Sequence, residues 1–335
     1  MKRSKRLLCC ILAGALVFCL AGCGVSGQGS GQKMEATLSF IHGQATSHPF
    51  QAGADRFAEL VEEKTRGNVK VEIYPAGQIA SGAKAVEFVQ MGTADVALES
   101  TMSAENFIPE MGVLNLPFLF ENEEQVYKVL DGPIGEELEA AAEARGFKVL
   151  CWMHNGFRDI SNSARPINGP EDLKGLKIRV PESQVFLNTF ESLGAIPTPM
   201  AVSEVFTAMQ LKTVDGQENP SAIFVNNKYN EVNNYYSITH HIFTAEPLIM
   251  NLERFESLST ESQKAVLEAA QEAAEYQRQI AINIAEEELQ QIKDAGVQVN
   301  EVEDKTAFKK AVQPVYDSVK DQYGTLIEKI QAAAQ

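Results

Sequence analysis

The sequence predicts an α/β fold of two lobes, with mixed, mostly parallel sheets flanked by helices. Its 335 residues are more than one ordinary α/β domain needs and suit two. Strand and helix patterns alternate in two separate series, over 36–99 and 178–216, and this order is typical of parallel sheets covered by helices. A helical pattern over 260–295 would be roughly 50 Å long at about 1.5 Å per residue, more than one small lobe needs.

The N-terminus has the pattern of a bacterial lipoprotein signal. Four cations precede an apolar run over 7–21, as in secretory signals. The run ends in LAGC at 20–23, which resembles a lipobox. We therefore expect a signal peptide over 1–22, lipidation of Cys23 and a flexible Gly, Ser and Gln-rich tether over 23–34. A transmembrane anchor is the alternative, although the run is short for a span.

Charge and cysteine content exclude several classes of protein. Loss of residues 1–22 removes four positive and no negative charges, which changes the net charge from −16 to −20. Such an acidic surface argues against binding nucleic acid or anionic lipid headgroups, and an anionic ligand would need locally placed cations. Besides Cys23 only Cys151 would remain, so we expect no intrachain disulfide. Cys151 lies in an apolar strand pattern, which favours a buried residue over a nucleophile.

In the first series, polar residues follow two predicted strands. Ligands bind at the carboxyl ends of strands in such sheets, so Gln44, in the loop after the first strand, and Glu99, after the third, are candidate contacts. The alternative for Glu99 is a solvated loop position, the commoner place for a glutamate. The predicted strands span 36–41, 69–73 and 94–98, and the predicted helices span 49–67 and 83–91.

The second series follows a strand over 147–153, and Arg158 lies just past that strand. Chain crossings near 153 and 248 would link the two lobes and form a hinge. The predicted strands of this series span 178–180, 195–199 and 214–216, and the predicted helices span 184–193 and 203–211.

The C-terminal third is predicted to be mainly helical. Residues 260–263 resemble a capping box at the start of the long helix. A coiled-coil partner is the alternative for this helix, but its apolar residues lack a sustained heptad. Apolar residues over 308–319 recur at helical spacing, which predicts a packing helix kinked at Pro314.

Several motifs in a fixed order resemble one family. They are His48-Pro49, YPAGQ at 74–78, LPFLF at 116–120, GFR at 156–158, PEDLKGLKIRVP at 170–181 and VDGQENP at 214–220. Together they are similar to the extracytoplasmic solute-binding subunit of tripartite ATP-independent periplasmic (TRAP) transporters, the DctP family.

The resemblance implies a two-lobed fold like that of type II periplasmic binding proteins. Lobe one would comprise 35–155 and about 245–285, and lobe two 156–244 and about 286–335, with the long helix spanning both. It also implies an extracytoplasmic receptor, to which the LAGC sequence adds a lipid anchor, and we expect neither a cofactor nor enzymatic activity. The ligand would be an organic acid, either a sugar acid such as a uronate or aldonate or a C4-dicarboxylate, delivered to membrane permease subunits.

By this resemblance Arg179 is the main carboxylate clamp, Arg158 a second cation and Asn219 a hydrogen-bond donor to the same carboxylate. The residues themselves support Arg179, because a guanidinium on a rigid strand matches both oxygens of a carboxylate and stays charged. The alternatives are a structural ion pair for Arg179, a surface ion pair for Arg158 and a turn before Pro220 for Asn219.

Other positions concern the rest of the ligand. Glu246 falls where relatives carry polar groups, and with Glu99 it would accept hydrogen bonds from hydroxyl groups. A dicarboxylate would need a second cation, for which Lys84 and Lys212 are candidates without motif support. Val202, often aromatic in relatives, and Lys212, usually small, depart from the family pattern.

Two other functions compete with transport. The same pocket could feed a sensor kinase, or the chain could be a secreted sugar-acid enzyme, since an acid-rich chain always offers carboxylate pairs. The sequence contains no H-E-x-x-H, G-x-S-x-G or Walker motif, and its five histidines lack metal-ligand spacing, so we expect neither a metal site nor catalysis.

Overall fold

The computed structural model describes residues 34–334. The predicted signal peptide, most of the tether and Cys23 lie outside the described residues. The chain from Met34 onward forms one compact unit. No helix in this part of the chain is both long and apolar enough to cross a membrane.

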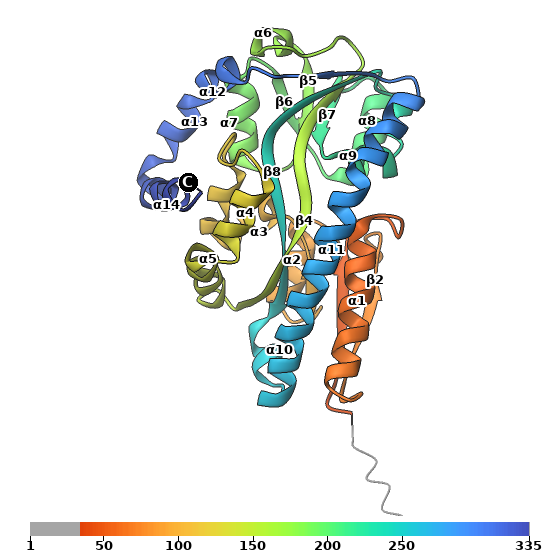
Figure 1. Cartoon of the computed structure of the whole chain (residues 1–335), viewed down its shortest axis with the longest axis vertical. Helices are drawn as coiled ribbons and strands as arrows, with labels where there is room; N and C mark the ends of the chain where they lie inside the picture. The colour runs from red at the N-terminus through yellow and green to blue at the C-terminus, as the bar shows by residue number, and fades with distance from the viewer. Residues whose placement is uncertain (1–33, 335) are drawn as a thin grey trace, which may run out of the picture. The chain divides into compact units, whose positions relative to one another are not determined.

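A nine-stranded mixed sheet organises the fold (Figure 1). Strand order is β2-β1-β3-β8-β4-β7-β5-β6, and β9 pairs with β8. The pairs β1–β2, β1–β3, β5–β6 and β5–β7 are parallel, as the two series predict, whereas β8 is antiparallel to its neighbours β3 and β4. The strands are β1 (Ala36–His42), β2 (Val69–Tyr74), β3 (Val96–Leu98), β4 (Phe147–Asn162), β5 (Lys177–Val180), β6 (Ile196–Pro199), β7 (Gly216–Asn219), β8 (Tyr235–Asn251) and β9 (Gln298–Glu301).

Two long strands join the parallel sets. β4 has 16 residues and β8 has 17; β8 pairs with β3 of the first set, β4 pairs with β7 of the second set, and the two long strands pair with each other. The predicted strand over 147–153 is therefore too short, because β4 continues through three register shifts to Asn162. Arg158 consequently lies within β4 and not beyond it. Similarly, β7 starts at Gly216 and carries Asn219, whereas the sequence predicted a strand that ends at Gly216.

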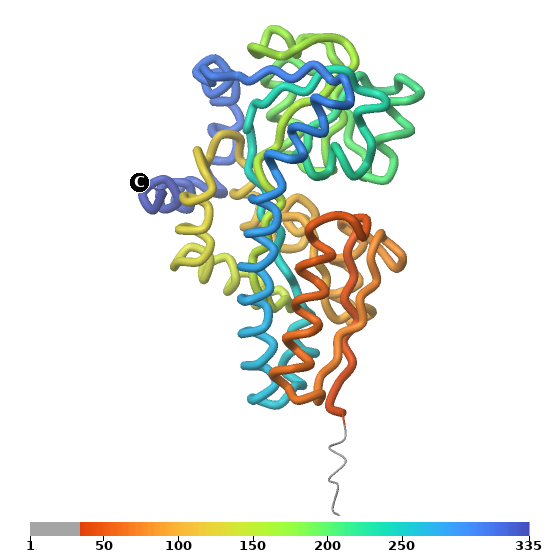
Figure 2. Tube along the Cα trace, turned by 45° about the vertical axis from the view of Figure 1, so that its right-hand side comes forward, coloured from red at the N-terminus to blue at the C-terminus, as the bar shows by residue number. Residues whose placement is uncertain are grey.

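Helices cover the sheet, and the longest packs against both α1 and β4 (Figure 2). This helix, α11, has 35 residues and is capped by Ser259, one residue before the predicted box. The α-helices are α1 (Pro49–Lys64), α2 (Ala83–Gln90), α3 (Thr101–Ala104), α4 (Glu123–Leu130), α5 (Pro133–Glu143), α6 (Pro170–Leu173), α7 (Gln184–Ser192), α8 (Val205–Gln210), α9 (Ser221–Asn226), α10 (Leu252–Glu256), α11 (Thr260–Asp294), α12 (Thr306–Ala311), α13 (Gln313–Ser318) and α14 (Lys320–Ala333). The 3-10 helices of the described residues are η1 (Pro109–Asn115), η2 (Val202–Glu204) and η3 (Tyr229–Glu231).

The apolar face of α1 illustrates how these elements are held together. Phe57 is fully buried and packs edge-on against Phe40 of β1 at 5.9 Å between ring centroids. Burying a phenylalanine contributes about 1.5–3 kcal/mol, so this contact fixes the helix on the sheet. At the other end of the chain the predicted kink is a complete break, because α12 ends before Pro314, which lies in the first turn of α13.

We expect Gly216→Ala to disrupt the pairing of β7 with β4. A methyl group at this position would lie 2.1 Å from the carbonyl oxygen of Ser161, and backbone cannot move aside as a flexible side chain can. The free energy of unfolding should fall by about 3 kcal/mol or more, measured by urea denaturation. Gly67→Ala is the control, since nothing lies within 4 Å of its added methyl group and only its φ of +79° opposes the change. Equal losses in the two variants would contradict the steric explanation.

Candidate ligand-binding site

A cavity of about 250 Å³ lies where the loops and strand ends of both parallel sets meet β4 and β8. All six predicted ligand contacts line it, although they come from positions as far apart as 44 and 246. The predicted residues in its lining are Gln44, Glu99, Arg158, Arg179, Asn219 and Glu246, and the sequence candidates Lys84 and Val202 line it as well.

Arg179 lies on β5 and is only 4% exposed. Its Nε and Nη2 donate to the Met200 carbonyl oxygen at 3.0 and 2.6 Å. Within residues 34–334 no carboxylate oxygen lies within 4.0 Å of its guanidinium, so the structural ion pair considered as the alternative is not formed. Burial lowers its pKa to about 10 although the charge of Glu218 raises it, so Arg179 remains protonated at neutral pH. It is therefore a buried cation that faces the cavity.

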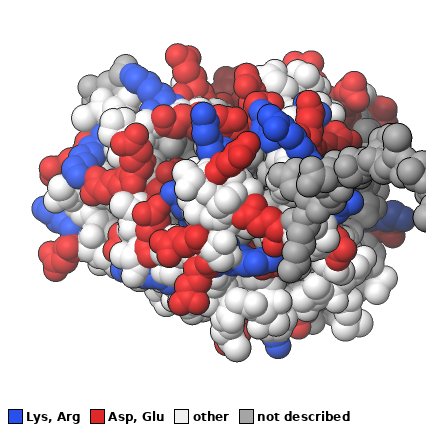
Figure 3. Space-filling model, turned by 90° about the horizontal axis from the view of Figure 1, so that it is seen from below, with Lys and Arg blue, Asp and Glu red and all other residues white. Residues whose placement is uncertain are grey.

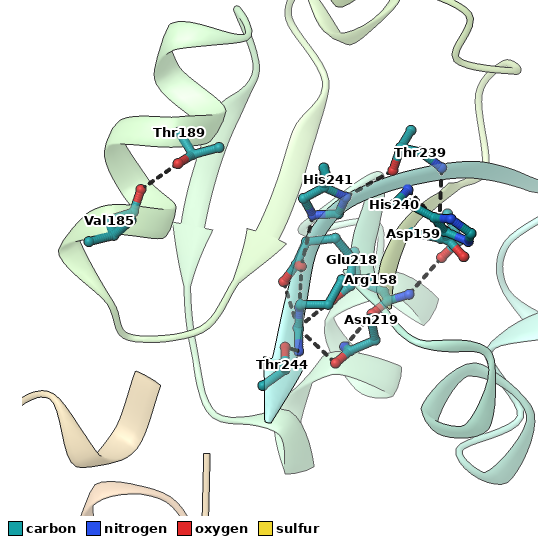
Figure 4. A network of polar contacts seen from close by, with 12 residues as sticks. Arg158, Asp159, Val185, Thr189, Glu218, Asn219, Thr239, His240, His241 and Thr244 are labelled. Carbon is teal, nitrogen blue, oxygen red and sulfur yellow. Dashed lines mark hydrogen bonds and ion pairs between the residues drawn. The ribbon is translucent and has the colours of Figure 1, made fainter. Parts of the chain in front are cut away.

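Arg158 is paired differently (Figure 4). It is 2% exposed, and its Nε and Nη2 donate to the two carboxylate oxygens of Glu218 at 2.6 and 2.8 Å. The surface ion pair proposed as its alternative role is thus a fully buried one. Burial would raise the pKa of Glu218, but the charge and hydrogen bonds of Arg158 outweigh it, with a smaller contribution from His241, and hold this pKa below its usual value. Glu218 therefore neutralises much of the charge that Arg158 brings to the cavity.

Asn219 ends β7 and is oriented by its neighbours. Its side-chain oxygen accepts from Arg158 Nη2 at 2.8 Å, and its amide nitrogen donates to Gln217 Oε1 at 2.5 Å. Because an amide nitrogen carries two hydrogens, one remains for a ligand carboxylate. Asn219 is buried in a strand rather than in a solvent-exposed turn.

Two buried carboxyl groups line the same cavity. Glu99 is 8% exposed and Glu246 is 3% exposed, so the solvated position considered for Glu99 is wrong. Glu246 Oε1 accepts from Asn155 Nδ2 at 2.8 Å, whereas Glu99 Oε1 has no hydrogen-bond partner among the described residues. Burial raises the pKa of Glu246 to about 8 although Arg158 and Asn155 lower it, and burial and the charge of Glu246 raise the pKa of Glu99 well above its usual value. At neutral pH this pair can donate as well as accept hydrogen bonds.

Of the two candidates for a second cation, only Lys84 lines the cavity. Lys84, in the first turn of α2, is exposed and lines the cavity, and its Nζ lies 5.6 Å from the centre of the Phe88 ring. Lys212 is exposed, has a φ of 57° and is not part of the lining. The sequence missed Asn155 and Glu218, although Glu218 lies inside the QENP motif that marked Asn219.

Acidic side chains are common on the surface and line a second cavity. Asp and Glu are spread across the face seen in Figure 3, with Lys and Arg between them. A second cavity of about 250 Å³ is lined by acidic side chains such as Glu123, Glu286 and Glu288 and by no lysine or arginine, so it does not suit an anion.

Cys151 is a free, buried thiol, and burial raises its pKa. Among residues 34–334 no three His, Cys, Asp or Glu side chains are placed to hold a metal ion.

Comparisons with known proteins identify the family. The family model for bacterial extracellular solute-binding proteins, family 7 (DctP), matches residues 40–322. A TRAP periplasmic solute-binding protein from Roseobacter denitrificans with bound β-D-glucuronate is 33% identical, covers 88% of this chain and 99% of its own, and superposes with a TM-score of 0.86. One from a Polaromonas species bound to D-erythronate is 36% identical, covers 89% and 98%, and has a TM-score of 0.86.

A curated relative extends the comparison. The C4-dicarboxylate-binding periplasmic protein DctP of Rhodobacter capsulatus is 32% identical over 291 residues, 86% of this chain and 87% of its own. The family model, the identity and the shared fold agree over most of the chain. The chain belongs to the DctP family of extracytoplasmic solute-binding proteins of TRAP transporters, a family of receptors and not of enzymes.

Proposed function

We propose that this receptor binds a hydroxylated organic acid, a uronate or an aldonate, with the carboxylate on Arg179. The observation that carries the proposal is the buried Arg179 guanidinium. It faces the cavity, and it has no carboxylate partner among the described residues. A planar fork of donors in such a place matches both oxygens of a ligand carboxylate. Asn219 and Arg158 donate to the same group.

Glu99 and Glu246 favour a sugar acid over a plain dicarboxylate. Their buried carboxyl groups suit hydroxyl groups, which both donate and accept hydrogen bonds, and they provide no positive charge for a second carboxylate. The relatives with bound glucuronate and erythronate agree with this choice. A C4-dicarboxylate is the second candidate, supported by Lys84 in the lining and by the dicarboxylate-binding relative from Rhodobacter capsulatus.

Binding would close two lobes on the ligand. Lobe one comprises 35–155 and about 245–285, with Gln44, Glu99 and Glu246, and lobe two comprises 156–244 and about 286–335, with the two arginines. A ligand that contacts both lobes stabilises the closed state because only that state offers all the contacts. The closed receptor would then deliver the acid to its TRAP permease subunits; a sensor kinase is the alternative recipient.

Thermal unfolding against a ligand panel tests the ligand class. The panel contains D-glucuronate, D-galacturonate, D-erythronate, succinate and, as a neutral control, D-glucose. A sugar acid at about 100 times its dissociation constant should stabilise the protein by about 2.7 kcal/mol, which is a clear rise in melting temperature. Stabilisation by succinate alone would transfer the proposal to dicarboxylates, and stabilisation by glucose alone would refute an acid receptor.

We also propose that Cys23 carries the lipid that attaches the receptor to the membrane, supported by the LAGC sequence at 20–23. Wild-type protein should partition into the detergent phase in Triton X-114 extraction and incorporate labelled palmitate. Cys23→Ser should move the protein into the aqueous phase and prevent labelling. Without acyl chains the protein has no lipid methylene groups to bury in the detergent micelle. Retention of the variant in the detergent phase would instead indicate an uncleaved apolar anchor.

A further inference from the structure

The strand β4 carries a bulge beside the ligand site. His154 pairs with Ala245 and Gly156 pairs with Thr244, so Asn155 is an extra residue without a partner in β8. Gly156 has a φ of 107°, a conformation that favours glycine. A bulge re-aims a side chain, and here Asn155 lines the ligand cavity and donates to Glu246 Oε1 at 2.8 Å.

One side chain of the long helix holds this bulge. Gln277 of α11 is 0% exposed, and its Oε1 accepts from the backbone nitrogen of His154 at 2.8 Å. Its Nε2 donates to the backbone oxygen of His154, also at 2.8 Å. A single amide therefore satisfies both main-chain groups of the residue just before Asn155. Buried main-chain groups left unpaired are costly, so this double contact fixes the local backbone.

The helix α1 makes room for Gln277. A methyl group on Gly53 would lie 2.9 Å from Gln277 Cγ and 3.1 Å from Met153 Sδ. Gly53 thus admits the Gln277 side chain between α1 and β4. The arrangement connects α1, α11, the bulge and Glu246 in one continuous set of contacts, although Gln277 itself does not line the cavity.

We propose that Gln277 is a positioning residue of the ligand site: it clamps His154, thereby turns Asn155 toward Glu246, and so fixes the carboxyl group that contacts the ligand. This inference rests on the proposed function for its consequence for binding, but the clamp can be tested without any ligand. If Gln277 merely attached α11 to the sheet, replacing it would lower the free energy of unfolding and leave the pKa of Glu246 unchanged.

The ligand-free test follows the ionisation of Glu246 by NMR in the protein labelled with ¹³C-glutamate, with Glu246→Gln to assign the signal. Wild type should titrate with a pKa of about 8. In Gln277→Leu we expect the midpoint to rise by about one pH unit, because the Asn155 donor that favours the ionised form loses its fixed position. Asn155→Ala should produce the same rise.

The matched control lies on the same helix and strand. Gln271 Nε2 donates to the Leu150 oxygen of β4 at 3.1 Å, but Gln271 is outside the cavity and the bulge. Gln271→Leu should lower stability and leave the Glu246 midpoint unchanged. An unchanged midpoint in Gln277→Leu, or an equal shift in both leucine variants, would overturn the proposal.

A second variant keeps the proposal testable where Gln277→Leu does not fold. Gln277→Glu retains the shape, and its protonated form can both accept from and donate to His154, whereas its ionised form cannot donate. D-Glucuronate should bind this variant as wild type does at pH 5.5 and about tenfold more weakly at pH 8.5, measured by calorimetry. If the ratio of variant to wild-type affinity were the same at pH 5.5 and pH 8.5, the proposed clamp would be refuted. If wild type fails to bind D-glucuronate, the proposed ligand class fails for this acid, while the NMR titration still decides the role of Gln277.

Discussion

Arg179→Ala should abolish detectable binding of the acid that stabilises the wild-type receptor. Among the described residues the buried guanidinium has one neutral hydrogen-bond partner, the Met200 carbonyl, so a ligand carboxylate would be its main counter-charge. Removing one member of a buried, hydrogen-bonded charge pair costs about 2–5 kcal/mol or more, which weakens affinity by a factor of roughly 30 to several thousand. Isothermal calorimetry at neutral pH measures this loss directly.

The variant Arg179→Lys distinguishes the contribution of the positive charge to ligand affinity from that of the planar guanidinium. Lysine keeps the positive charge but not the planar fork, so we expect binding that is weaker than wild type and stronger than in the alanine variant. The folded state of both variants is checked by their cooperative unfolding without ligand. An alanine variant that binds the acid with wild-type affinity would show that Arg179 is not the carboxylate clamp.

Glu246→Gln should make the ligand-free protein more stable at pH 8. Burial raises the pKa of Glu246 to about 8 from an ordinary value of 4.5. Between these pH values the folded protein holds a proton that the unfolded chain has released, so the free energy of unfolding falls as pH rises through this window. Replacing the carboxyl group with a neutral amide removes a cost on the order of 3 kcal/mol at pH 8. Urea denaturation between pH 5 and 8.5 should show a flatter profile for the variant.

Glu218→Gln is the control of opposite sign. Arg158 and His241 hold the pKa of Glu218 below its usual value, so the stability contributed by this carboxylate is present at neutral pH and is lost as pH falls through its folded pKa. Its amide variant leaves Arg158 buried without a counter-charge, which costs about 3–5 kcal/mol. If both glutamine variants destabilised the protein at pH 8, the proposed protonation of Glu246 would be wrong.

The gain in stability should have a cost in function. A buried carboxyl group without a charged partner lowers the stability of the folded state at neutral pH. Ionisable groups with such shifted pKa values are concentrated at binding sites. Glu246→Gln keeps one acceptor and one donor group, so it should alter selectivity among sugar acids more than it weakens binding overall. Comparing D-glucuronate with D-galacturonate in wild type and variant measures this effect.

The sequence predicted residues that line the cavity because motifs mark short segments. Arg179 follows from an alternating strand pattern and from the PEDLKGLKIRVP motif, and Glu99 follows from its place at a strand end. Lys84 and Lys212 could not be separated in this way. Both are isolated lysines near predicted helix ends, and only the packing of α2 beside the cavity distinguishes them.

The partner of each charge was decided by the tertiary structure alone. Arg158 and Glu218 lie 60 residues apart, and they meet because β4 continues past its predicted end and pairs antiparallel with β7. The extension of β4 depends on bulges that interrupt its register, and a period-two pattern does not describe an interrupted strand. Burial of Glu99 and Glu246 likewise arises from long-range packing.

By itself, then, the sequence determined the alternating helices and strands of the two series and the family, and it marked the residues proposed for the carboxylate clamp, because these depend on local patterns and short motifs. The tertiary structure decided which arginine is already neutralised, which carboxyl groups are buried together and how Gln277 reaches the bulge in β4. Ion pairing and desolvation depend on distances between residues far apart in the chain, and no local pattern encodes those distances.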